Sequence, residues 1–64
     1  MAASANNTIS IQQFNLYKEA KSIVRSEFNH KLKLSERWQD DVKMFVVLTG
    51  HERLTELYNN SLAA

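Results

Sequence analysis

Apolar residues recur with the period of an α-helix in the segment that follows Ser10. At about 100° per residue, apolar side chains fall on one half of a helical wheel and polar ones on the other. The apolar half consists of Phe14, Leu16, Tyr17, Ala20, Ile23, Val24 and Phe28. Ser10 and Gln13 have the spacing of a capping box, and Ile9 and Phe14 that of a hydrophobic staple. These signals predict a first helix over about residues 11–29.

A second helix is predicted over about residues 36–48, after a connector in which the helical period is lost. Ser35 is a suitable N-cap, and Glu36 in the first turn suits the positive end of the helix dipole. The run from Met44 to Leu48 is apolar on every side, which a small bundle has difficulty burying. The alternative for this run is a short β-strand paired with residues 31–34.

Gly50, the single glycine of the chain, decides how the C-terminal half is organised. As a left-handed C-cap it ends the second helix, and Thr49 with Glu52 then forms a second capping box. A third helix follows over about residues 51–62, with an apolar stripe of Leu54, Leu57, Tyr58 and Leu62. Alternatively, the second and third helices are continuous, at a cost of about 1 kcal/mol for an interior glycine. We favour the break, because it lets both apolar stripes face one core.

The predicted fold is therefore an all-α, small three-helix bundle. Residues 1–8 are small and polar without periodicity, and we expect them to form a disordered N-terminal tail. Residues 9–64 are expected to form a single helical domain. A chain of 64 residues buries only about 60% of the surface that its unfolded form exposes, so spare stability is small. The alternative, with the second and third helices joined as one long helix, stays open.

Composition removes most catalytic chemistry from consideration. The chain has no Cys and no Pro, and its two His residues cannot complete a zinc site. It contains no nucleophile motif and no phosphate-binding glycine loop, so we predict a non-enzymatic protein without cofactor or metal. No apolar run has the roughly 18–20 residues of a membrane span, and the N-terminus lacks the layout of a signal peptide. The expected location is cytoplasmic.

The charges are near balance overall but unevenly distributed, with a net charge of +1. Residues 17–34 have five basic and two acidic side chains, a local charge of +3, and residues 35–64 have three basic and five acidic ones, a local charge of −2. The basic edge of the first helix and connector consists of Lys18, Lys21, Arg25, Lys31 and Lys33. This edge is either an electrostatic rim beside a protein interface or a weak nucleic-acid-binding surface.

Surplus apolar residues indicate protein association. Three short helices cannot easily enclose Met44, Val47 and Leu48 in addition to Trp38 and Phe45. Surplus apolar surface on a small chain usually marks a partner site. The predicted partner-binding residues are Met44, Val47, His51, Leu54 and Tyr58. The competing interpretation is a monomeric bundle whose first and third helices cover these residues.

The predicted function is that of a small protein-interaction module, such as an accessory subunit, an inhibitor or a regulatory modulator of phage or plasmid type. It would bind another protein, or a further copy of itself, through an apolar patch on the second and third helices. The alternative function is weak nucleic-acid binding or transcription modulation by the basic edge of the first helix.

One segment of the chain resembles a known family. Arg53-Leu54-Thr55-Glu56-Leu57, followed by Asn60 and Leu62, resembles a helix of the Hha/YmoA family, and residues 11–14 are similar to the opening of that family. Members are small helical bacterial modulators that bind a nucleoid-associated protein, so the resemblance implies a regulatory protein as partner. The family has Asp-His directly before the Arg, whereas this chain has His51-Glu52 after Gly50. The polar contact of that acidic residue is therefore not carried over.

Overall fold

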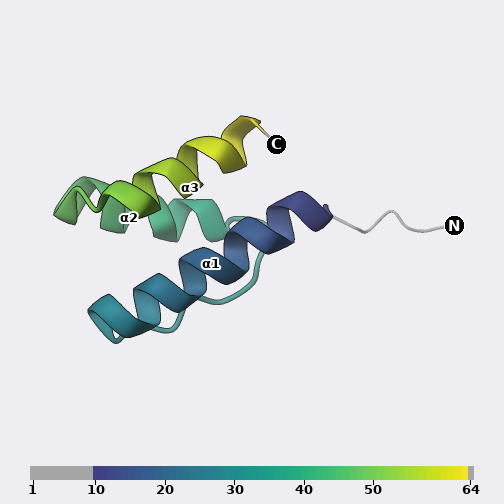
Figure 1. Cartoon of the computed structure of the whole chain (residues 1–64). Helices are drawn as coiled ribbons and strands as arrows, with labels where there is room; N and C mark the ends of the chain where they lie inside the picture. The colour runs from purple at the N-terminus through teal and green to yellow at the C-terminus, as the bar shows by residue number, and fades with distance from the viewer. Residues whose placement is uncertain (1–9, 64) are drawn as a thin grey trace, which may run out of the picture.

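The structure is a computed structural model that describes residues 10–63, and these residues form three α-helices (Figure 1). Helix α1 comprises Ile11–Phe28, α2 comprises Trp38–Thr49 and α3 comprises Glu52–Ala63. The predicted all-α fold of three helices is confirmed, and the alternative of one long second helix is wrong. Residues 1–8, predicted as a disordered tail, lie outside the described residues, as does Ile9 of the predicted staple.

The start of α1 follows half of the predicted capping box. Ser10 Oγ accepts a hydrogen bond from the backbone N–H of Gln13 at 3.1 Å, as an N-cap does. The side chain of Gln13 does not return to the cap. Its Nε2 donates to the carbonyl of Ser61 in α3, and its Oε1 accepts from Gln39 Nε2 in α2 at 3.0 Å. Gln13 therefore joins all three helices at one end of the bundle.

Helix α1 ends in a left-handed residue, Asn29, with φ of 52°. The N–H of Asn29 donates to the carbonyl of Arg25 at 3.1 Å, and the N–H of His30 donates to that of Val24 at 3.2 Å. These bonds satisfy carbonyls that the end of the helix would otherwise leave without partners.

Helix α2 begins at Trp38, two residues later than predicted. Ser35 does not act as its N-cap, because its hydroxyl accepts instead from the N–H of Arg37 at 3.2 Å, and its carbonyl accepts from Trp38 at 3.4 Å. A serine hydroxyl that accepts a hydrogen bond from the backbone N–H two residues later closes a tight turn. Because of this turn, the helix begins further along the chain. The run Met44–Leu48 is helical, so the strand alternative is wrong.

Gly50 separates α2 from α3 by adopting φ of 68°, a left-handed conformation that glycine reaches without steric cost. Its N–H donates to the carbonyl of Val46 at 2.9 Å and closes α2. Apart from Gly50 and its two chain neighbours, no atom lies within 4 Å of the position that a Cβ would occupy, so backbone conformation and not space favours glycine here.

The predicted capping box of Thr49 and Glu52 is not formed. The hydroxyl of Thr49 donates to the carbonyl of Phe45 at 2.6 Å and accepts from the N–H of His51 at 3.2 Å. His51 takes the capping position instead, since its Nδ1 accepts from the N–H of Leu54 at 3.2 Å. The bend at Gly50 places His51, and not Thr49, beside the free N–H groups of α3.

The core lies where α3 packs against both α1 and α2. Helices α1 and α2 run in the same direction and α3 runs the opposite way (Figure 1). The buried apolar residues are Tyr17, Ala20, Val24, Leu32, Trp38, Val42, Leu54 and Leu57. Burial of each large apolar side chain contributes about 1.5–3 kcal/mol before the entropy of ordering is subtracted.

Two aromatic pairs span the distance between α1 and α2. Tyr17 meets Trp38 edge-on with ring centroids 5.7 Å apart, and Phe28 stacks on Phe45 at 5.0 Å. The connector between these helices is fastened by Leu32, whose side chain is buried and whose carbonyl accepts from the hydroxyl of Tyr17 at 3.0 Å. The connector thus contributes to the core as well as linking the helices.

Candidate protein-interaction surface

The outer side of α2 exposes a group of large apolar side chains, which we call the α2 patch: Met44, Val47 and Leu48. Their exposed fractions are 47%, 71% and 73%. At 3.6 residues per turn, these positions lie within about 100° of one another on the helical wheel and on the opposite side from the buried Val42. The patch exists because an all-apolar helical run has more apolar faces than one small core can cover.

The structure separates the five predicted partner-binding residues. Met44 and Val47 are exposed, His51 and Tyr58 are half-buried, and Leu54 is fully buried in the core. Leu54 therefore offers no surface to a partner, which corrects its assignment to the patch. The bend at Gly50 is the reason, because it turns the stripe of α3 inward.

Leu48 is the patch residue that the sequence-based set omitted. It belongs to the same all-apolar run as Met44 and Val47, and it is the most exposed of the three. Leu48 could have been identified from the sequence, because it directly follows Val47 in the apolar run and lies within about 100° of it on the helical wheel. Phe45 and Val46 of the same run are half-buried against the core, so the structure divides the run between core and surface.

His51 has a structural position beside the patch. Its ring lies edge-on to Phe28 with centroids 6.2 Å apart, and Nδ1 is occupied as an acceptor by the α3 cap. An imidazole that accepts at Nδ1 in its neutral form has its hydrogen on Nε2. His51 thus holds the start of α3 against the aromatic residues of α1.

The predicted basic edge is exposed along α1 and the connector: Lys18, Lys21, Arg25, Lys31 and Lys33. Lys18 Nζ lies 5.3 Å from the ring centroid of Phe14, and Lys21 Nζ lies 5.9 Å from that of Tyr17. Within residues 10–63, none of the basic residues of this edge forms an ion pair. Their charge is therefore available to an anionic surface.

Arg53 connects α3 to α1 through Glu19. Its Nη2 donates to Glu19 Oε1 at 2.8 Å, and its Nη1 donates to Glu56 at 2.7 Å. The hydrogen bond from Arg53 holds the pKa of the Glu19 carboxyl below its ordinary value, and the same carboxylates raise the pKa of Arg53. Both side chains are partly exposed, so solvent screens this pair.

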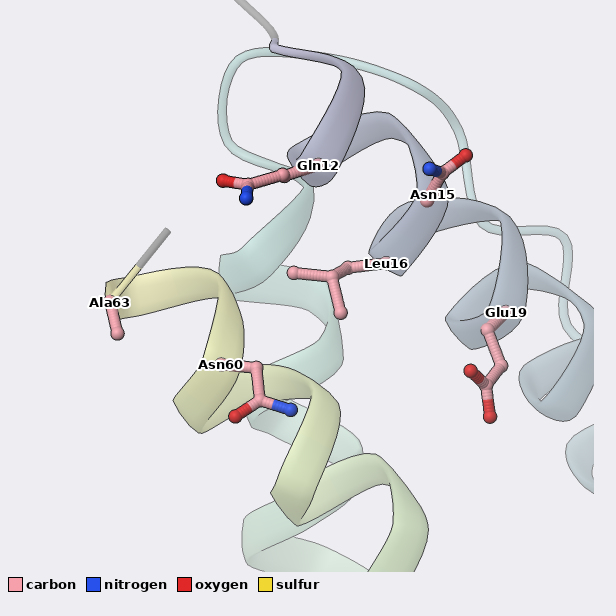
Figure 2. Close-up of a pocket in the computed structure, with 6 residues that line it drawn as sticks. All are labelled: Gln12, Asn15, Leu16, Glu19, Asn60 and Ala63. Atoms are coloured by element: carbon pink, nitrogen blue, oxygen red, sulfur yellow. The ribbon is translucent and has the colours of Figure 1, made fainter.

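A shallow groove of about 480 Å³ lies between α1 and α3 (Figure 2). Its lining residues are Gln12, Asn15, Leu16, Glu19, Asn60 and Ala63. The amide side chains offer hydrogen-bond donors and acceptors around an apolar floor formed by Leu16. The titratable lining residue, Glu19, is already bonded to Arg53. The groove is separate from the α2 patch, which lies on a different helix.

Residues 10–63 contain no group of three or more His, Cys, Asp or Glu side chains placed to hold a metal ion. Within the same range, no helix is both long and apolar enough to cross a membrane.

Comparison with known protein families, with characterised proteins and with solved structures finds no match to this chain. The resemblance of residues 53–62 to the Hha/YmoA family is thus not supported by a family match.

Proposed function

We propose that this protein is a non-enzymatic interaction module that binds a protein partner through the α2 patch. The observation that supports the proposal is the exposure of Met44, Val47 and Leu48 at neighbouring positions on one helix. Full burial of an apolar side chain of this size contributes about 1.5–3 kcal/mol. Covering three of them therefore offers a partner a substantial part of the free energy that a specific complex needs.

The local structure around the patch favours binding. Trp38 is buried at the start of α2, and Gly50 closes the helix at its other end. The patch is therefore presented on a helix whose ends are fixed before a partner arrives. A preorganised surface loses little conformational entropy on binding, so more of the free energy of burial becomes affinity.

We assign the basic edge of α1 to protein association and not to nucleic acid. Single-stranded nucleic acid binds surfaces that combine cations with open aromatic faces. In α1 the cation of Lys18 lies over Phe14 and that of Lys21 over Tyr17. These rings are less open to a base, which supports the role of the lysines as an electrostatic rim. An accessory subunit, an inhibitor and a regulatory modulator are all compatible with this arrangement.

Site-specific photo-crosslinking tests the proposal. A photoreactive side chain at position 47 should capture partner chains in cells, and the same group at Asn59 is the control, because Asn59 is exposed on α3. We expect discrete adducts from position 47 and at most background from position 59. Equal yields from the two positions would contradict the proposal.

Val47→Glu provides a second, independent measurement. Because Val47 is 71% exposed, the variant should keep the circular dichroism and melting temperature of the parent protein. A photoreactive group at the neighbouring position 48, which is 73% exposed, should give adducts in the parent protein and lose them in the variant. Collapse of the fold would instead show that Val47 belongs to the core, since an unpaired buried carboxylate is strongly unfavourable.

A further inference from the structure

One side of α1 has exposed residues at alternating intervals of three and four positions. We call this set the α1 row: Ile11, Phe14, Lys18, Lys21 and Arg25. The spacing keeps side chains on one side of a helix, and the five positions lie within about 80° on the helical wheel. Ile11 is 79% exposed and Phe14 is 40% exposed, and the three basic residues are exposed as well. The row therefore extends for about 21 Å, from an apolar end to a basic end.

The positive charge of the α1 row is not neutralised within the described residues. Lys18, Lys21 and Arg25 form no ion pair within residues 10–63. As neighbours at i, i+3 and i+7, they repel one another. The acidic residues of α1, Glu19 and Glu27, lie about 120° and 160° from the centre of the row on the helical wheel. The basic end of the row thus has charge of one sign, which an anionic partner would stabilise.

The connector after α1 adds to this charge through its contact with Tyr17. The Tyr17 ring centroid lies 5.9 Å from Lys21 Nζ, and the Tyr17 hydroxyl donates to the carbonyl of Leu32 at 3.0 Å. One aromatic side chain therefore contacts both the α1 row and the connector. Lys31 and Lys33, which adjoin Leu32, are exposed. Their backbone lies close to Tyr17, so their charges add to the positive potential around the row.

Aromatic rings hold two of the three cations of the row in place. Lys18 Nζ lies 5.3 Å from the ring centroid of Phe14, and Lys21 Nζ lies over Tyr17. A cation above a ring is attracted by the negative face of the ring. Because these contacts restrict both side chains before a partner arrives, less conformational entropy is lost when the partner binds.

We propose that the α1 row is the docking site for an acidic helix of a protein partner. That helix would carry apolar side chains at one end and carboxylates at intervals of three and four residues along the rest. Helices that pack side by side match rows with this spacing. Lys18 and Arg25 are seven residues apart, which is about 10 Å along α1 and one heptad of a partner helix. Each cation can then form a charge-assisted hydrogen bond with a carboxylate.

This inference rests on the proposed function only in taking the partner to be a protein. The surface that it assigns lies on α1, whereas the α2 patch lies on α2. Loss of binding at one surface is therefore distinguishable from loss at the other.

The packing of α1 favours a protein helix over a lipid surface. A helix that binds a membrane interface buries an apolar face along its length. The apolar face of α1 is already in the core, where Tyr17, Ala20 and Val24 are buried. The apolar residues of the row are confined to its first turn, at Ile11 and Phe14. A phosphate backbone would likewise pair with the cations but leave these two side chains in water.

Fluorescence anisotropy of a labelled synthetic peptide mixed with the full chain tests the proposal. The peptide has leucine and then glutamate at intervals of three and four residues, and alanine or glutamine elsewhere, so that it favours a helix. In the control peptide, glutamine replaces every glutamate of the row. We expect the acidic peptide to bind with an affinity that falls as salt is added. The control peptide should bind at least about tenfold more weakly.

Charge reversals in the chain locate the binding site. Lys21→Glu should weaken binding of the acidic peptide roughly tenfold. Lys43→Glu is the matched control, since Lys43 is an exposed lysine of α2 without an ion pair in the described residues, and it should change the affinity less than about twofold. A chain with Lys18→Glu, Lys21→Glu and Arg25→Glu should instead bind a peptide with lysine in place of its glutamates. Because the substituted side chains are exposed, circular dichroism should match that of the parent protein.

Three results would overturn this proposal. One is equal weakening by Lys21→Glu and Lys43→Glu, because the peptide would then respond to net charge alone. Another is binding of phosphatidylserine vesicles or of a uridine oligonucleotide in preference to the acidic peptide at the same salt concentration. The third is self-association of the wild-type chain that Lys21→Glu removes, because a second copy would then occupy the row.

Val47→Glu separates this inference from the proposed function. The variant should bind the acidic peptide as the parent protein does, because the α1 row is intact. Failure of the wild-type chain to bind the acidic peptide, together with adducts at position 47, would overturn the assignment of the α1 row while supporting the α2 patch.

Discussion

His51 shows how one side chain can determine where a helix begins. Its Nδ1 accepts from the N–H of Leu54, a role that Ser, Thr, Asp and Asn usually fill. The sequence indicated Thr49 for this role, because Thr49 and Glu52 have capping-box spacing. It could not show that the left-handed turn at Gly50 directs the Thr49 hydroxyl back to Phe45. Capping motifs are local patterns, whereas the choice between two caps depends on the path of the chain.

Removing the His51 cap should destabilise the fold. His51→Ala leaves the N–H of Leu54 without its acceptor, and we expect a loss of about 1 kcal/mol in the free energy of unfolding, measured by urea denaturation. His51→Asp replaces the Nδ1 acceptor by a carboxylate oxygen and adds a negative charge at the positive end of α3, so it should lose less. Equal losses in the two variants would show that the aromatic contact with Phe28, and not the cap, is what matters.

The ion pair of Glu19 with Arg53 predicts a weak dependence of stability on pH. Because the pKa of Glu19 is lowered from 4.5 in the folded state, its contribution is fully present above pH 4.5 and is lost as pH falls through the lowered value. The urea midpoint of Glu19→Gln should therefore fall less on acidification from pH 7 to about pH 3 than that of the parent protein. Glu27→Gln is the matched control, since Glu27 forms no ion pair within residues 10–63. Identical pH profiles for both variants would exclude the pair as a source of stability.

At the level of the elements, the helices themselves were largely predictable and their junctions were not. The wheel of α1 and its Ser10 cap specify that helix almost to the residue. The start of α2 was misplaced because the Ser35 hydroxyl closes a turn onto Arg37. Leu32 was assigned to a connector without periodicity, although its side chain is fully buried. A single buried residue in an irregular segment produces no period, so no pattern in the sequence could identify it.

The break at Gly50 is the element-scale feature that most directly tests the fold. Gly50→Ala introduces no clash, because nothing apart from its chain neighbours lies within 4 Å of the new Cβ, but alanine is strained at φ of 68°. We expect a loss of about 1–2 kcal/mol in the free energy of unfolding, with a smaller loss for Gly50→Asn because asparagine tolerates this conformation better. A stability equal to that of the parent protein for Gly50→Ala would argue for a continuous helix.

At the level of the whole molecule, the sequence predicted part of the exposed apolar surface, but it placed one core residue there by mistake. The apolar run of α2 indicated Met44 and Val47 correctly as exposed apolar side chains. Leu54 was grouped with them because it aligns with Met44 and Val47 on the wheel of a continuous helix, whereas the break makes it part of the core. Whether a residue is exposed depends on how the helices are oriented relative to one another, and positions on a helical wheel do not determine that orientation.

The Tyr17 hydroxyl should be a long-range determinant of stability, because it fastens the connector to α1. Tyr17→Phe keeps the ring but removes the buried bond to the carbonyl of Leu32, and we expect a loss of about 1–3 kcal/mol in chemical denaturation. Tyr58→Phe is the matched control, because no hydrogen bond of the Tyr58 hydroxyl occurs within the described residues. A Tyr17→Phe variant as stable as Tyr58→Phe would show that the connector is held by Leu32 packing alone.

The bond between Gln13 and Ser61 joins positions 48 residues apart and closes the bundle around α3. Helices α1 and α2 reach each other mainly through long aromatic side chains, and α3 supplies their shared packing surface. During synthesis the first two helices therefore emerge from the ribosome before the helix that completes their core. The core that α1 and α2 share can therefore close only once α3 is free to pack against both of them.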